Sequence, residues 1–291
     1  MGIATVIKTS RPRFWLYLAG PFLVGAIWSI PSSGNLKSVQ TLFQDPFFLI
    51  SFFYFLIPAN ILLYGVNDLS DKHIDQKNQK KLGRENTNIG GEKERIIKKW
   101  FLISLAISLL FLLILVIRSN FKEAIWFSTF LFLSIFYSLK PIRFKSLPFL
   151  DFASNFLYVI PGIISFGLFS GSTPPIQILL SSAFWAWSMH LFSAIPDIKS
   201  DGNQGVRTSA VMLGREISLL LCMIFWSISL FIVSVSGASL LMVAVGFLYP
   251  LTPLFLMLSD GAEDTKTYWK FPYLNAIYGF IIFATGLVRL I

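Results

Sequence analysis

The sequence predicts an all-α protein that crosses a membrane several times, and three observations support this fold class. The 291-residue chain is 55% hydrophobic and only 13% charged, whereas soluble domains average about 25% charged residues. Its mean hydropathy is +0.68. Its apolar residues gather in long stretches, several of them close to the roughly 20 residues that a membrane-spanning helix needs.

We expect nine spanning helices, because nine apolar stretches are separated by segments that carry Pro, Gly or charge. The shortest connection lies near Gly237, where two helices are joined by almost no loop. We expect one membrane domain over residues 1–291. The nine stretches are 14–30, 47–66, 100–117, 123–139, 149–169, 176–195, 217–235, 238–258 and 272–290.

The distribution of Lys and Arg predicts which side of the membrane each connection occupies. With nine spans, 20 of the 24 basic residues fall on the side that holds the amino terminus. Because basic residues favour cytoplasmic segments, the amino terminus is expected inside. The net charge of +9 is therefore explained by topology, and no nucleic-acid partner is expected. The single cysteine, Cys222, excludes an internal disulfide and a cysteine metal cluster.

Two aspartate clusters at the predicted cytoplasmic helix ends are the strongest functional signal. One holds Asn67, Asp68, Asp71 and Asp75, and the other is the segment from Asp197 to Asp201. Carboxylates close to a bilayer are costly, so they indicate function. In a helix, residues four apart share a face, whereas Asp68 is rotated from the face of Asn67 and Asp71. Two such faces can hold Mg²⁺, which completes its shell with water and phosphate oxygens. One cluster alone would be consistent with a solvated helix end.

The predicted loop after residue 139 supplies cations for a pyrophosphate. Lys140 and Lys145 offer point charges, and Arg143 can bind two phosphate oxygens at once. Tyr137 can direct its hydroxyl into the same site, and Arg207 is a weaker phosphate candidate. The alternatives are ordinary membrane anchoring for the cations and an interfacial position for the tyrosine.

Other chemistries lack their motifs. The chain has no Gly-x-Ser-x-Gly, Walker or Gly-x-Gly-x-x-Gly run, so acyl transfer, ATP hydrolysis and Rossmann-type dinucleotide binding have no support. The Asp-Gly-x-x-Ala-Arg run of CDP-alcohol phosphotransferases is also absent. A cation transporter is only a remote alternative. Transporters place their sites near the bilayer midplane, whereas the aspartate clusters here lie at the predicted cytoplasmic ends of the helices. A membrane enzyme that handles a pyrophosphate fits best.

At these residues the chain resembles the UbiA superfamily of intramembrane prenyltransferases. The resemblance implies nine helices around a central cavity, with a cytoplasmic cap formed by segments 67–99 and 196–216. It also implies Mg²⁺ and an isoprenyl diphosphate donor. The matching residues are Asn67, Asp68, Asp71 and Asp75 in the first motif, Asp197, Asp201, Gly205, Thr208 and Val211–Gly214 in and after the second, and Tyr137 with Lys140.

Further segments resemble the branch that elongates lycopene to fifty-carbon carotenoids. These are Ser10–Trp15 with Gly20–Pro21, Pro58–Asn60 with Leu63–Asp68, and Ile195–Ile198. The resemblance implies dimethylallyl diphosphate as donor and a carotenoid end as acceptor, with water able to quench the product cation. A quinone precursor, a chlorophyllide or haem is the alternative acceptor. We expect Asp71, Asp197, Asp201 and Tyr137 to act in catalysis, and Asn67, Asp68 and Asp75 to complete the metal ligands.

Overall fold

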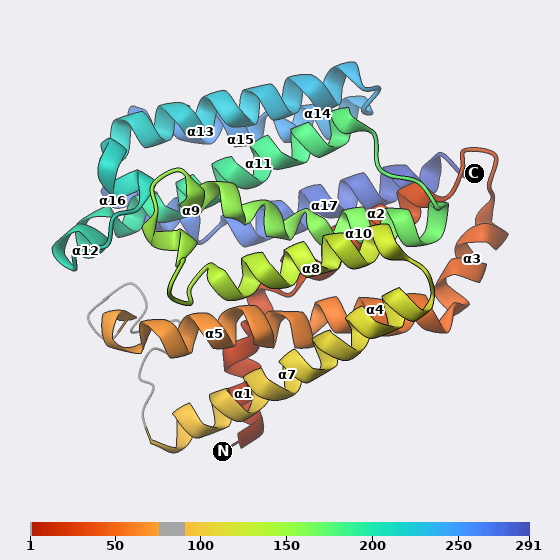
Figure 1. Ribbon diagram of the computed structural model, residues 1–291. Coiled ribbons are helices and arrows are strands. Elements are labelled where there is room, and N and C mark those ends of the chain that lie inside the picture. Colours follow the sequence, from red (N-terminus) through yellow and green to blue (C-terminus); the bar gives the residue numbers. More distant parts are fainter. Residues whose placement is uncertain (1, 76–90) are drawn as a thin grey trace. The chain divides into compact units, whose positions relative to one another are not determined.

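The computed structural model describes residues 2–75 and 91–291, with the side chains of 72–75 left aside (Figure 1). Within this part the chain is helical and contains no strand, so the all-α prediction is confirmed for it. The chain divides into two compact units. Unit 1 comprises Met1–Arg143, Ile160–Thr173 and Leu287–Ile291, and unit 2 comprises Phe144–Val159 and Pro174–Gly286. The single domain predicted over residues 1–291 stays a prediction.

Unit 1 contains the amino-terminal helices and one helix from the middle of the chain. Its long helices meet in sequence-adjacent pairs, and α10 returns to pack on α2 and α8. The elements are α1 (Gly2–Ser10), the 3₁₀ turn η1 (Pro12–Phe14), α2 (Leu16–Ser29), α3 (Leu36–Gln44), α4 (Pro46–Leu56), α5 (Pro58–Asp75), α7 (Glu92–Ile117), α8 (Phe121–Phe136) and α10 (Ile160–Ser170).

Glycines let α2 and α10 approach closely. A Cβ on Gly25 would collide with the Gly162 carbonyl and the Ser165 hydroxyl, and a Cβ on Gly162 would lie 3.0 Å from the Pro21 carbonyl oxygen. Small residues at helix crossings are typical of membrane proteins, because close backbone packing replaces the hydrophobic driving force there.

The predicted span 47–66 lies within one apolar membrane span, Pro46–Asp71, which has a break at Ile57. α4 ends at Leu56, the next residue Ile57 has a non-helical φ of −122° and ψ of −65°, and α5 starts at Pro58. The proline lacks the amide hydrogen that would continue α4. Around this break, Tyr54 stacks on Phe111 of α7 with ring centroids 5.0 Å apart. This aromatic contact fixes the end of α4 against α7.

Unit 2 contains the remaining helices. Its centre is the packing of α11 on α13 and of α13 on α15. The elements are η2 (Phe144–Ser146), α9 (Leu150–Ala153), η3 (Ser154–Tyr158), α11 (Ile176–Ala194), η4 (Ile195–Asp197), α12 (Ile198–Asn203), α13 (Ser209–Val235), α14 (Leu240–Gly246), α15 (Leu248–Met257), α16 (Ala262–Tyr268) and α17 (Phe271–Val288).

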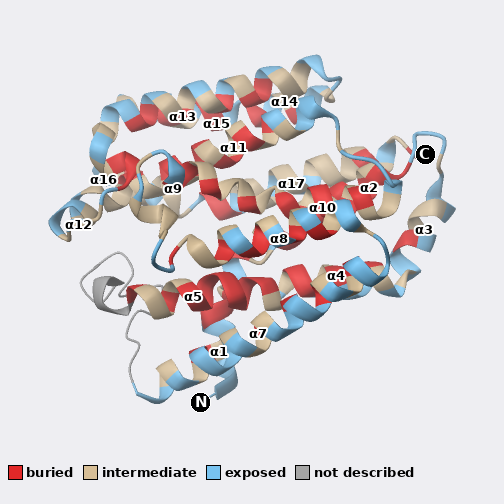
Figure 2. Ribbon diagram, in the orientation of Figure 1, coloured by how far each residue is buried: buried red, intermediate tan, exposed pale blue. Residues whose placement is uncertain are grey.

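An aromatic cluster forms the core of unit 2. Trp226 stacks on Phe271 at 5.6 Å, and both rings contact Tyr249. Buried serines link α11 to α13, since Ser188 donates to the Cys222 carbonyl over 2.9 Å. Figure 2 shows buried and exposed residues alternating along α13. The exposed residues of α13 include Ile217, Leu220, Ile224 and Phe231, and an apolar stripe of this kind suits contact with lipid.

Seven helical stretches in the described part are long and apolar enough to cross a membrane, and the chain is an integral membrane protein. The other two predicted spans correspond to α2 and α8, which have 14 and 16 residues. The predicted count of nine and the cap stay predictions.

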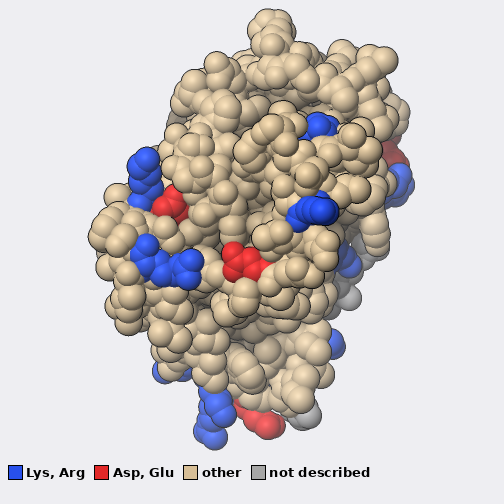
Figure 3. Space-filling model, turned by 90° about the vertical axis from the view of Figure 1, so that its right-hand side faces the viewer, with Lys and Arg blue, Asp and Glu red and all other residues tan. Residues whose placement is uncertain are grey.

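The tight connection near Gly237 is confirmed, because α13 ends at Val235, Gly237 has a φ of +88°, and α14 begins at Leu240. On the face drawn in Figure 3, charged residues are few and scattered.

Candidate active site

The first aspartate motif lies on the last turns of α5. The helix runs to Asp75, so residues 67–75 of the segment predicted as part of the cap are helical. Asn67 and Asp71 share one helix face, and Asp68 lies on the neighbouring face with Tyr64. Asp68 is 5% exposed and Asp71 is 3% exposed. The side chain of Asp75 lies outside the described residues.

The loop that follows α8 contacts the face formed by Asn67 and Asp71. The Arg143 guanidinium donates to the Asp71 carboxylate over 3.0 Å, and the Ser138 hydroxyl donates to the Asn67 amide oxygen over 2.7 Å. Arg143 has a φ of 51°, a backbone conformation that costs a non-glycine residue about 1 kcal/mol or more. The structure thus brings Arg143, predicted to bind phosphate, to the first motif.

The amino-terminal turn contacts the other face. Arg11 donates to the Asp68 carboxylate over 2.8 Å, and its guanidinium lies 4.7 Å from the centre of the Tyr64 ring. Like Arg143, Arg11 has a φ of 51°. Sequence analysis placed Arg11 among the cytoplasmic cations and in the segment Ser10–Trp15, but it did not predict the contact with Asp68, because a contact across 57 residues leaves no local signal. The basic residue before Pro12 was the one available hint.

These contacts gather hard oxygen donors and two cations at one end of α5. Two nearly buried carboxylates would be costly without partners, and each receives an arginine. The donor set of one amide and two carboxylates is the kind that Mg²⁺ prefers, so the residues fit the expected metal. In the described part, no group of three or more His, Cys, Asp or Glu residues is spaced to hold a metal. A site on the first motif therefore needs the amide oxygen of Asn67 or ligands from elsewhere.

The second motif lies in unit 2. Asp197 ends the 3₁₀ turn η4, and Asp201 lies in α12. Both are half-buried. α12 ends before Thr208, whose hydroxyl caps α13 by accepting from the Val211 amide over 3.2 Å. Since the two motifs belong to different units, their predicted meeting around a common ligand stays a prediction.

The other predicted site residues differ in exposure. Lys140 and Arg207 are exposed, and Tyr137 and Lys145 are half-buried. Tyr137 and Lys140 belong to unit 1 with the first motif, whereas Lys145 and Arg207 belong to unit 2 with the second. Their proposed roles stay predictions.

A buried polar cluster in unit 2 was not predicted. The Asp151 carboxylate is fully buried and accepts from the Ser209 amide over 2.6 Å, from the Ser209 hydroxyl, and from the Phe152 amide over 2.8 Å. The cluster fixes the start of α13, which follows the second motif. A single Asp within an apolar stretch was its sequence signal.

Comparison with known proteins defines the class to which this helical membrane protein belongs. The profile described as the UbiA prenyltransferase family matches residues 18–275, so the chain belongs to this family and is a prenyltransferase. The fold agrees. The solved structure of a UbiA homolog from Archaeoglobus fulgidus, bound to DMAPP and Mg²⁺, matches with a TM-score of 0.66 and 18% identity, over 98% of this chain and 99% of that one.

The relatives found by sequence indicate a particular branch of this family. The chain is 36% identical over 280 residues to the lycopene elongase/hydratase of Haloarcula japonica, covering 95% of this chain and 88% of that protein. It is also 36% identical over 281 residues to the lycopene elongase/hydratase of Halobacterium salinarum, covering 96% and 95%. The predicted resemblance to the lycopene elongase branch is thus confirmed.

Proposed function

We propose that the protein transfers a dimethylallyl group from dimethylallyl diphosphate to an end of lycopene or a related carotenoid. The grouping of Asn67, Asp68 and Asp71 with two arginines at the end of α5 carries the proposal. The relatives named lycopene elongase/hydratase support the acceptor. We place this site on the cytoplasmic side, with the amino terminus inside, nine spans forming one domain, and segments 67–99 and 196–216 as its cap.

The proposed metal ligands are Asn67, Asp68, Asp71, Asp75, Asp197 and Asp201. Bound Mg²⁺ would neutralise the diphosphate and make it a better leaving group. The cations Lys140, Arg143, Lys145 and Arg207 bind diphosphate oxygens, and Tyr137 orients them. Arg143 can exchange its contact with Asp71 for one with phosphate, because its planar guanidinium binds either oxyanion in the same way.

The reaction needs no protein nucleophile. The C–O bond of the donor breaks, and its electron pair leaves with the diphosphate. The π electrons of the acceptor's terminal double bond then form the new C–C bond, which leaves a tertiary cation on the acceptor. That cation either loses a proton or takes up water and then loses a proton. The names of the relatives favour hydration, so the expected product carries one hydroxyl for each transferred group.

Turnover by the purified protein tests the proposal. The protein is incubated with Mg²⁺, labelled dimethylallyl diphosphate and lycopene, and the products are identified by mass. Parallel reactions contain a quinone precursor, a chlorophyllide or haem as acceptor. Asp71→Ala and Asp197→Ala should abolish turnover without unfolding the protein. The exposed Asp260 provides the matched control, and Asp260→Ala should leave turnover unchanged. Full activity in both motif variants would overturn the metal assignment, and prenylation of another acceptor alone would overturn the carotenoid.

A further inference from the structure

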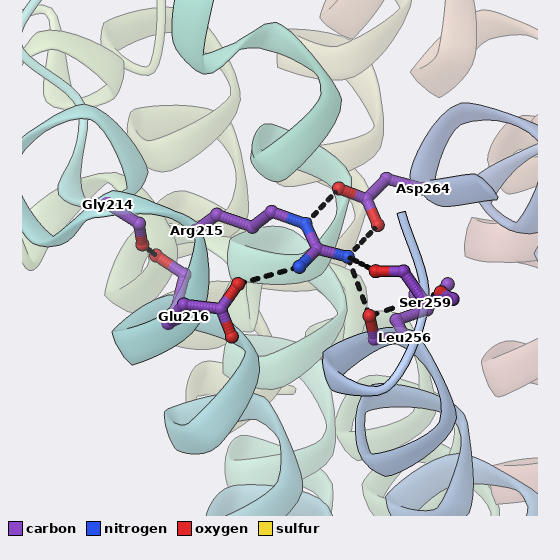
Figure 4. Close-up of polar contacts among 7 residues, drawn as sticks. Gly214, Arg215, Glu216, Leu256, Ser259 and Asp264 are labelled. Atoms are coloured by element: carbon purple, nitrogen blue, oxygen red, sulfur yellow. Dashed lines mark hydrogen bonds and ion pairs between the residues drawn. The ribbon is translucent and has the colours of Figure 1, made fainter. Parts of the chain in front are cut away.

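Arg215 ties three segments of unit 2 together (Figure 4). Its guanidinium donates to both oxygens of Asp264 in α16, over 2.7 and 2.8 Å. It also donates to the Leu256 carbonyl over 2.7 Å and to the Ser259 carbonyl over 3.3 Å, at the end of α15. One side chain at the start of α13 therefore fixes the connection between α15 and α16.

The contact with Asp264 is the strong part of this network. Two parallel bonds between a guanidinium and a carboxylate give both energy and a defined geometry. The Asp264 side chain is 6% exposed and that of Arg215 is 23% exposed. Arg215 also contacts Glu216 over 2.7 Å, but the Glu216 side chain is 62% exposed, and water screens such a pair. The two acidic partners of Arg215 thus provide an internal comparison.

The stability of α13 itself does not explain an arginine at this position. Gly214, the preceding residue, has a φ of 76° and a ψ of 173°, so the regular part of α13 starts again at Arg215. A cation at the amino-terminal end of a helix opposes the helix dipole. The position is unfavourable unless a carboxylate compensates it, and Asp264 supplies that carboxylate from another helix.

Two of the segments joined by Arg215, α13 and α16, pack against the elements that carry the second aspartate motif. The turn η4, which ends in Asp197, packs against both α13 and α16, and α12, which carries Asp201, packs against α13. The distance between α13 and α16 therefore determines the position of η4. Because the Arg215–Asp264 pair bridges these helices, it controls that distance.

We propose that Arg215 and Asp264 form a positioning pair that holds Asp197 and Asp201 in the geometry needed for the metal and the diphosphate. The inference rests on the proposed function, since it assumes that these aspartates bind there. Neither residue of the pair touches the substrate. Loosening the pair leaves both aspartates present but displaces them, so binding of the metal and the donor weakens while binding of the acceptor does not change.

Three variants test the pair. Asp264→Asn removes the charge of the partner, and Arg215→Lys keeps the charge but loses the paired bonds. Glu216→Gln is the matched control, because it removes the exposed partner of the same arginine. If Asp264→Asn does not fold, the same measurements are made on Arg215→Lys and Asp264→Glu. Hydrogen exchange of the segment 195–203 reports on the motif without turnover. Kinetics report the Mg²⁺ concentration for half-maximal rate and the KM values of donor and acceptor.

The expected result is faster exchange in 195–203 and a rise of about tenfold in the Mg²⁺ requirement and the donor KM, the size expected for coupled neighbours. The acceptor KM should stay the same, and Glu216→Gln should match wild type. Unchanged exchange and Mg²⁺ requirement, or an equal loss of protection throughout unit 2, would overturn the positioning role. Asp197→Ala separates the two proposals. If that variant is fully active, the proposed role of Asp197 in binding the metal fails, and the positioning pair fails with it. If it is inactive while the pair variants behave as wild type, only the positioning pair fails.

Discussion

Replacing Arg143 tests whether the first motif is built to hold a metal. Arg143→Gln removes the cation that contacts Asp71 at 3.0 Å and keeps a polar side chain. The Asp71 side chain is 4% exposed and that of Arg143 is 20% exposed. Breaking a buried pair from one side costs about 3–5 kcal/mol, whereas a fully exposed pair contributes about 0.2–1 kcal/mol. This pair lies nearer the buried limit, so we expect the variant to be about 2–3 kcal/mol less stable without metal.

Mg²⁺ should then stabilise the variant more than the wild type. In the wild type the metal competes with Arg143 for Asp71, whereas in the variant it compensates a carboxylate that has lost this cation. The assay is thermal unfolding in detergent, with and without Mg²⁺ after treatment with a chelator. Lys8→Gln is the control, since Lys8 is an exposed cation of the same unit. A variant as stable as wild type, or an equal Mg²⁺ shift in both proteins, would refute the reasoning.

Other variants probe separate parts of the structure. Asp151→Asn replaces a buried acceptor of three hydrogen bonds and should cost about 2–4 kcal/mol, visible as a lower unfolding temperature; unchanged stability would contradict the role of this cluster. Gly25→Ala should cost about 1–3 kcal/mol through the clash with α10, whereas Gly20→Ala, where a Cβ has only an ordinary contact at 3.9 Å, should be tolerated. Arg11→Gln removes the cation that contacts the nearly buried Asp68 and should cost about 1–3 kcal/mol, and an unchanged unfolding temperature would contradict the importance of this contact.

The positions of the helices could be predicted because they depend on local composition. Apolar stretches, the glycine turn at Gly237 and the spacing of Asn67 and Asp71 are all visible within a few residues. Pro58 is visible in the sequence, but the break at Ile57 was not predicted because the apolar run continues through it. The helical start of α13 at Ser209 was missed, since residues 209–216 are less apolar than the span that follows.

The contacts of the candidate site could not be predicted in the same way. Arg11 and Asp68 lie 57 residues apart, and Arg143 and Asp71 lie 72 apart. Their pairing depends on how α1, α5 and the end of α8 pack, which no local pattern records. The same holds for Arg215 and Asp264, which are 49 residues apart. The residue types indicated the chemistry, whereas the partners emerged only from tertiary structure.

The most direct test of the account is to locate the metal in crystals grown with dimethylallyl diphosphate and Mn²⁺ in place of Mg²⁺. The anomalous signal of Mn²⁺ marks each metal ion independently of the protein coordinates. The account predicts that metal ions bound to the diphosphate directly contact oxygens of both Asp71 in α5 and Asp197 in η4. Metal bound to one motif alone, with the other motif out of reach of the diphosphate, would contradict it.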